Sequence, residues 1–82
     1  MMSYTVYVLE SEKNGSRYVG YTQDLMNRLE EHNSDRNTST AGKGPWKLIY
    51  SENYSSLELA KNREKFLKTG QGRIVLRNIV GA

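Results

Sequence analysis

The chain has 82 residues and a net charge of +3, and its length predicts a single domain over residues 1–82. A domain this small buries only about 60–65% of its unfolded surface, so we expect a shallow surface site. The lack of cysteine excludes disulfides and thiolate-bound zinc, and the single histidine excludes a site of several imidazoles. Any metal is therefore expected to be held by oxygen, which favours Mg²⁺ or Mn²⁺.

The charge is divided unevenly along the chain. Residues 1–42 carry four Lys/Arg and six Asp/Glu, which gives −2, whereas residues 43–82 carry eight and three, which gives +5. A basic C-terminal half suits a polyanion, although a solvated lysine-rich helix face would give the same pattern. Because no apolar run approaches the ~20 residues that cross a bilayer and no signal peptide is evident, we expect a cytoplasmic location without membrane partners.

The first half of the chain predicts a hairpin and a helix. Residues 4–9 and 17–22 are rich in β-branched and aromatic side chains, and the turn signal Asn14-Gly15 separates them. Gly20 inside the second strand indicates a bulge or a close approach of the backbone. Residues 24–33 predict a helix capped by Thr22 or Asp24, with an apolar stripe made of Leu25, Leu29 and, more loosely, Met26.

The second half predicts a polar, mobile loop, a strand and two helices. The loop covers residues 33–44, and the strand covers residues 46–52. A capping box with Ser55 as N-cap and Glu58 begins a helix that runs to about residue 68. Thr69-Gly70 ends this helix, and residues 72–80 form a short helical segment. The order β-β-α-β-α-α predicts an α+β fold with a three-stranded, mostly antiparallel sheet flanked by helices.

Two charged side chains are candidates for chemistry. Arg28 and His32 stand one turn apart beside the apolar stripe of the first helix, where they could clamp a phosphate. Alternatively, Arg28 pairs with Glu31 or Asp24, and His32 is only a favourable residue at the helix C-terminus.

Glu64 lies on the apolar side of the second long helix, where an unpaired carboxylate would be costly to bury. It must be paired or bound to a cation, and an ordinary ion pair with Lys61 or Lys68 would satisfy it. Six of the 82 residues are tyrosines, and Tyr7, Tyr18 and Tyr21 gather in the hairpin. Strand propensity explains where these tyrosines occur but not how many there are.

The order and spacing of these residues resemble the GIY-YIG nuclease superfamily. Thr5-Val6-Tyr7 is followed by Tyr18-Val19-Gly20, then by a helix with Arg28 and His32, and later by a helix with Glu64. The superfamily includes the N-terminal incision domain of the bacterial nucleotide excision repair nuclease, and a small single-domain bacterial group is the most similar. The resemblance covers residues 4 to about 79.

The resemblance implies a role for each matching residue. Tyr7 stands in the first motif, Tyr18 and Gly20 in the second, Arg28 at the superfamily's arginine, His32 at a frequent helix partner, and Glu64 at the metal-binding glutamate. Thr5 replaces the first glycine, and Val6 and Val19 replace isoleucines. Asn78 is a weakly aligned candidate for a late asparagine, and Tyr21 is a further neighbour of the site.

The function implied is a metal-dependent endonuclease that cleaves DNA, directed by structure or only weakly by sequence, in repair or recombination. Glu64 would hold Mg²⁺ or Mn²⁺, and Arg28 would bind phosphate. Tyr7 would accept a proton from the attacking water or orient that water, with His32 and Tyr18 as alternatives for the role of base. Non-specific backbone contacts would come from Lys43, Lys47, Lys61, Lys65, Lys68, Arg73 and Arg77.

Several alternatives remain open at the level of sequence. RNA remains a possible substrate, no small-molecule cofactor is expected, and the domain would act as a monomer or a weak homodimer. The competing interpretations are a nucleic-acid-binding module without catalysis and a protein-interaction domain that uses the tyrosines as its contact surface.

Overall fold

The computed structural model describes residues 3–34 and 40–81 and contains a three-stranded antiparallel sheet with three helices. The elements are β1 (Tyr4–Ser11), β2 (Arg17–Thr22), α1 (Leu25–Asn33), β3 (Trp46–Tyr54), α2 (Leu57–Leu67) and α3 (Gly70–Val80). Their order and the α+β class confirm the prediction. The strand order is β2-β1-β3, so β1 is central and pairs with both neighbours. No helix of the described ranges is long and apolar enough to cross a membrane.

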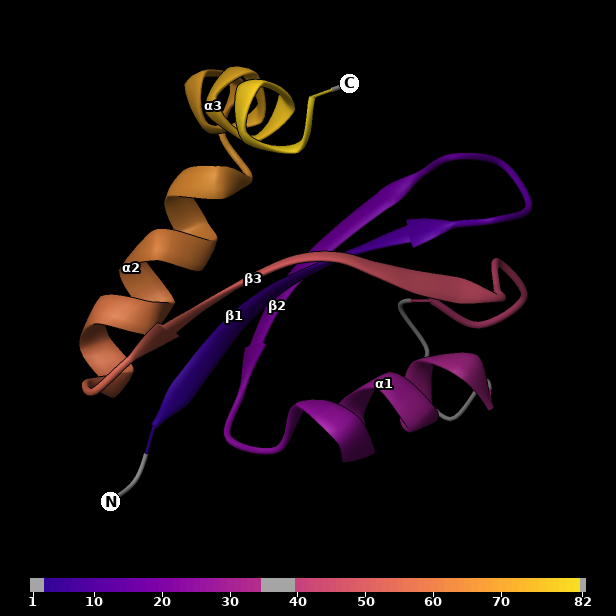
Figure 1. Cartoon of the computed structure of the whole chain (residues 1–82), viewed down its shortest axis with the longest axis horizontal. Helices are drawn as coiled ribbons and strands as arrows, with labels where there is room; N and C mark the ends of the chain where they lie inside the picture. The colour runs from indigo at the N-terminus through magenta and orange to yellow at the C-terminus, as the bar shows by residue number, and fades with distance from the viewer. Residues whose placement is uncertain (1–2, 35–39, 82) are drawn as a thin grey trace.

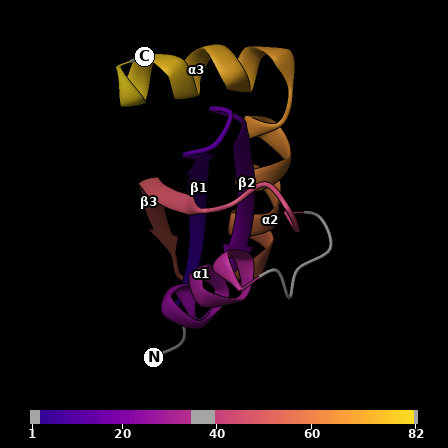
Figure 2. The same ribbon diagram turned by 90° about the vertical axis from the view of Figure 1, so that its right-hand side faces the viewer.

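The helices cover both faces of the sheet, as Figure 1 shows: α1 lies on one side and α2 on the other. In Figure 2, α3 crosses one end of the sheet, above the turn of the β1–β2 hairpin. Alternation along β1 explains this arrangement, because successive side chains point to opposite faces of a strand. Val6 and Val8 pack toward α2 and α3, whereas Tyr7 and Leu9 belong to the cluster on the α1 face.

The joint between α2 and α3 requires a glycine. A Cβ on Gly72 would overlap the backbone of Phe66 and Leu67, so only glycine lets α3 turn this tightly against the end of α2. Thr69 caps α3, since its hydroxyl accepts a hydrogen bond from the Gly72 amide at 3.0 Å. The close joint holds α3 across the end of the sheet.

A half-buried ion pair between Glu52 and Arg63 joins β3 to α2. Both oxygens of the Glu52 carboxylate accept hydrogen bonds from Arg63 at 3.0 Å, and the hydroxyls of Tyr50 and Tyr54 donate to them at 2.6 and 2.7 Å. Burial pushes the pKa of Glu52 upward, but the four hydrogen bonds outweigh it and leave the pKa below its ordinary value. This network positions α2 against the sheet.

Several local expectations were wrong. Ser56 caps α2 in place of Ser55, because its hydroxyl is the one that accepts from the Leu59 amide. Met26 is 76% exposed because α1 contacts the sheet only through the narrow stripe to which Leu25 and Leu29 belong. The elements β1, β3 and α3 are each longer than predicted. Within the loop expected to be polar and mobile, residues 35–39 lie outside the described residues, but Thr40 is buried.

Candidate active site

Helix α1 carries two of the predicted site residues. Asp24 caps it by accepting a hydrogen bond from the Asn27 amide at 3.1 Å, which confirms one of the two predicted caps. Leu25 and Leu29 pack against the sheet, so His32 in the last turn is directed inward and is completely buried. The apolar stripe that packs α1 against the sheet therefore also places the His32 imidazole on the face of the sheet.

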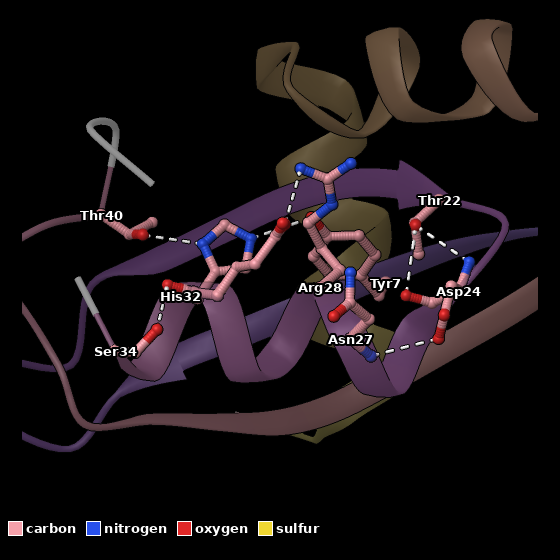
Figure 3. A network of polar contacts seen from close by, with 9 residues as sticks. Tyr7, Thr22, Asp24, Asn27, Arg28, His32, Ser34 and Thr40 are labelled. Atoms are coloured by element: carbon pink, nitrogen blue, oxygen red, sulfur yellow. Dashed lines mark hydrogen bonds and ion pairs between the residues drawn. The ribbon is translucent and has the colours of Figure 1, made fainter. Parts of the chain in front are cut away.

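The imidazole of His32 lies between two hydroxyl groups, as Figure 3 shows. Its Nε2 is 3.0 Å from Tyr7 Oη, and its Nδ1 is 2.7 Å from Thr40 Oγ1. Trp46 holds the Thr40 segment in turn, because its indole N–H donates to the Thr40 carbonyl at 3.3 Å. Tyr7, His32 and Thr40 thus form a continuous chain of buried hydrogen bonds, which links β1 to α1 and to the segment before β3.

Gly20 provides the space for the Tyr7 hydroxyl. The two residues face each other across β1 and β2, and a Cβ on Gly20 would lie 2.5 Å from Tyr7 Oη and 2.7 Å from its Cζ. Real Cβ atoms essentially never come so close to another atom. Gly20, predicted to mark a bulge or a close approach of the backbone, therefore marks a close approach to Tyr7, the tyrosine of the first motif.

Tyr18 joins this group and extends it toward the surface. Its ring centroid lies 6.3 Å from that of Tyr7 and 4.8 Å from that of His32. Tyr7 is only 2% exposed, whereas Tyr18 is partly exposed, and the Lys68 ammonium lies 5.8 Å from its ring centroid. Lys68 also donates to Glu64 at 2.9 Å, so α2 brings the predicted metal ligand to the β2 edge beside Tyr18.

Arg28 stands above Tyr7, one turn before His32 on α1 (Figure 3). Its guanidinium forms an ion pair of 3.3 Å with Glu31, which confirms the pairing considered as an alternative, and its side chain remains 41% exposed. An exposed guanidinium with one carboxylate partner keeps free donors for a phosphate.

Burial and charge set the protonation of the two buried groups. Burial raises the pKa of Tyr7, as does Tyr18, with the charge of Arg28 opposing them and those of Glu31 and Glu64 adding to them. Burial lowers the pKa of His32, and the positive charge of Arg28 lowers it further. At neutral pH the pair therefore consists of a protonated phenol and a neutral imidazole.

The donor set at Glu64 fits a hydrated Mg²⁺ or Mn²⁺ ion better than a fully chelated one. No group of three or more His, Cys, Asp or Glu side chains that could hold a metal occurs among the residues described. Glu64 Oε2 accepts from Lys68, and the carboxylate side chain is 19% exposed. Mg²⁺ usually keeps several waters and binds through one or two carboxylates together with substrate phosphate, so a single glutamate is sufficient.

The structure gathers only part of the predicted basic set. Lys68, Arg73 and Arg77 line one open pocket, and Lys61 and Lys65 line a second pocket together with Tyr21 and Glu64. By contrast, Lys47 lies near the start of β3, at the opposite edge of the sheet from β2, and Lys43 precedes it. Asn78 is exposed on α3, and no hydrogen bond within the described ranges joins it to Tyr7 or His32.

Sequence reasoning missed three supports of the site. Thr40 holds His32, Trp46 holds the Thr40 segment, and the Asn33 side chain bonds the backbone of Trp46 as a strand would, accepting at 2.6 Å and donating at 3.2 Å. Thr40 and Asn33 belong to a run of polar residues that predicts a loop, and no periodicity marks them. Trp46, which follows the loop, was the one signal in the sequence that apolar side chains are buried in this region.

Comparison with known proteins bears on these residues as a set. The model of the GIY-YIG catalytic domain matches residues 3–77. A UPF0213 protein of Streptococcus pneumoniae serotype 4 is 44% identical over 64 residues, which are 77% of this chain and 64% of that protein. A UPF0213 protein of Halobacterium salinarum is 39% identical over 64 residues, which are 77% of this chain and 82% of that protein.

A solved structure shares the fold. The solution NMR structure of a UPF0213 protein from Bacillus halodurans has a TM-score of 0.60 and 32% sequence identity, and the match covers 95% of this chain and 85% of that one. The family match spans both tyrosine motifs, α1 and α2, and so includes Tyr7, Tyr18, Arg28, His32 and Glu64. The chain therefore belongs to the GIY-YIG catalytic domain family.

Proposed function

We propose that this domain is a divalent-metal-dependent endonuclease that hydrolyses DNA phosphodiester bonds. The observation that carries the proposal is the buried chain Tyr7–His32–Thr40, with the hydrogen-bond distances of 3.0 and 2.7 Å given above, at a site where Tyr18 and Arg28 remain accessible. A neutral imidazole that is hydrogen-bonded at both nitrogens and joined to a phenol is arranged to accept a proton. A purely structural histidine would not need an accessible arginine and tyrosine beside it.

Arg28 binds the phosphate in this proposal. Its planar guanidinium offers paired donors that fit two phosphate oxygens, and 41% of its side chain is exposed. The ion pair with Glu31 is solvent-exposed, so it is weak and can yield to a phosphate.

Proton transfer is assigned to the buried pair, and orientation of water to Tyr18. Tyr18 is the member of the three-ring group that reaches the surface, so its hydroxyl is the one suited to hold the attacking water. The raised pKa of Tyr7 keeps its hydroxyl protonated, so Tyr7 cannot begin as a phenolate base. Instead, the Tyr7 oxygen takes a proton from the attacking water while its own hydroxyl proton passes to His32 Nε2, and Tyr18 orients that water from the exposed side of the site.

Glu64 would hold the Mg²⁺ or Mn²⁺ ion. When bound, the ion supplies charge stabilisation at the phosphate and at the leaving 3′ oxygen. Lys68, which pairs with Glu64 in the structure, would in that case stay over the Tyr18 ring or turn to the phosphate. A role in DNA repair or recombination belongs to the proposal as a property implied by the family resemblance, and a cytoplasmic location belongs to it as the expectation from the sequence.

The proposal is tested by cleavage of labelled single-stranded, duplex, flap and four-way-junction DNA with Mg²⁺, Mn²⁺ or EDTA. Glu64→Gln and Arg28→Gln should each reduce cleavage at least 100-fold, because each removes a group that acts in the transition state. Glu12→Gln is the control for loss of a carboxylate charge, since Glu12 is exposed in the turn of the β1–β2 hairpin and lines neither pocket. Equal cutting by wild type and both site variants, or cutting that persists in EDTA, would overturn the proposal.

A nucleic-acid-binding module without catalysis is the second candidate. One observation favours it: both charged groups of the site already form ion pairs, Glu64 with Lys68 and Arg28 with Glu31. This candidate predicts that wild type binds DNA or RNA, but that no substrate is cut with either metal. The same assays, with labelled RNA added to the panel, decide between the two candidates.

A further inference from the structure

A cationic pocket adjoins the site at the β2 edge. It has a volume of about 610 Å³ and lies between the end of the β1–β2 hairpin and the α2–α3 joint, where Figure 2 shows α3 crossing the sheet. Its wall is formed by Gly15, Ser16, Arg17, Tyr18, Val19, Leu67, Lys68, Arg73, Leu76 and Arg77. No acidic side chain is among these residues, although four of them are cations.

Among the residues that the structure describes, two of the cations have no carboxylate partner. Arg17 pairs with Glu10 at 3.3 Å and Lys68 with Glu64 at 2.9 Å, but Arg73 and Arg77 form no ion pair within the parts of the chain that the structure describes. They lie four residues apart on α3, on the same side as the pocket, and like charges at this spacing repel each other. An anion in the pocket would relieve that repulsion, so the pair is suited to a phosphate-bearing ligand.

The pocket is continuous with the reaction centre through Tyr18. This residue lines the pocket and also packs against His32, while Lys68 bridges its ring and Glu64. A nucleic-acid strand bound in the pocket would therefore pass directly beside the groups assigned to hydrolysis.

We propose that the pocket binds unpaired nucleotides of the substrate next to the bond that is cut, with Arg73 and Arg77 on their phosphates. This inference rests on the proposed function, because it takes the substrate of the neighbouring site to be nucleic acid. The volume falls within the range of about 300–1,000 Å³ typical of pockets for compact ligands, which suits a nucleotide. A cationic groove with an aromatic ring is also the usual arrangement for single-stranded nucleic acid.

A continuous duplex fits the pocket less well. Its bases are stacked inside and only its backbone faces outward, so it could contact the rim but would leave the hollow and the Tyr18 ring unfilled. A single strand, a flap or a frayed end can turn a base inward. The domain should therefore prefer DNA with an unpaired segment beside the cleavage point.

The test measures binding without cleavage. Fluorescence anisotropy in EDTA compares a labelled single strand with a duplex of equal length over a range of salt, for wild type and Arg73→Gln/Arg77→Gln. Two lost phosphate contacts should lower the slope of log K against log salt by about 1.4 for the single strand, which corresponds to about 25-fold weaker binding at 0.1 M salt. Lys13→Gln is the control for each lost charge, so its effect on log K is doubled for comparison with the double variant; Lys13 is exposed on the hairpin and does not line the pocket.

The outcomes separate this inference from the nuclease proposal. A loss for the single strand that exceeds the loss for the duplex supports the pocket, whether or not the protein cuts DNA when metal is added. Equal losses for both ligands would overturn the preference for unpaired nucleotides, and a loss in log K no larger than twice that of Lys13→Gln would overturn the pocket itself. Thermal unfolding of each variant by circular dichroism verifies that it is folded.

Discussion

Replacing Gly20 by alanine should break the contact on which the site depends. The new Cβ would lie 2.5 Å from Tyr7 Oη and 2.7 Å from Cζ, and Tyr7 cannot move freely because it is 2% exposed and hydrogen-bonded to His32. Overpacking in a core costs about 1–3 kcal/mol, and a buried hydrogen bond that is lost costs about 1–3 kcal/mol more. Alanine returns about 0.4–1 kcal/mol by restricting the unfolded chain. The expected net loss is thus about 1–5.6 kcal/mol.

The assay is urea unfolding followed by circular dichroism, with Gly70→Ala as the matched control. Gly70 has no atom within 4 Å of an added Cβ and no positive φ, so its substitution should leave stability unchanged or raise it slightly. In a Tyr7→Phe background, Gly20→Ala should cost less, because the nearest contact atom is gone. If Gly20→Ala were as stable as Gly70→Ala, the argument that Gly20 exists to accommodate Tyr7 would be refuted.

Three further predictions follow from the hydrogen-bond networks. Because burial lowers the pKa of His32, only the unfolded chain binds the imidazole proton as the pH first falls below 6.5. The free energy of unfolding should therefore decline below pH 6.5 and remain level above it. Urea titrations should show that His32→Gln flattens this decline. Glu52→Gln should cost about 2 kcal/mol in urea, because Arg63 loses its charged acceptor, and the contribution of this carboxylate should fade as the pH falls below 4.5 toward its lowered folded pKa. Asn33→Ala should remove both side-chain bonds to the Trp46 backbone and cost about 1–3 kcal/mol, with faster hydrogen exchange of the Trp46 amide as the specific signature and Asn33→Asp, which can only accept, as an intermediate case.

Local patterns in the sequence were sufficient for most of the fold. The strand predicted for residues 17–22 has those bounds in the structure, and the predicted first strand begins at Tyr4 as expected. These successes have one physical basis, because β-branched and aromatic side chains favour strands. Where two neighbouring serines could both cap α2, the capping-box spacing favoured Ser55, but the geometry makes Ser56 the cap.

Contacts between distant residues could not be predicted in this way. Glu52 and Arg63 are eleven residues apart, and nothing in the alternation of β3 distinguishes a glutamate facing α2 from one facing solvent. Thr40 is similar: it is a small polar residue in a polar run, and its burial depends on the imidazole that reaches it from α1. The resemblance to a family, by contrast, grouped Tyr7, Tyr18 and His32 before any geometry was known, and the structure brings their rings together.

Single-turnover cleavage of a labelled flap substrate with saturating Mg²⁺, measured as a function of pH, tests the central claim most directly. The proposal predicts that the rate of the wild type rises with pH through the lowered pKa of His32 below 6.5 and then levels off. Tyr7→Phe should be strongly impaired at every pH although it retains the ring and the fold. A Tyr7→Phe variant that cuts as fast as wild type, with an unchanged pH profile, would contradict the proposed roles of the buried Tyr7–His32 pair.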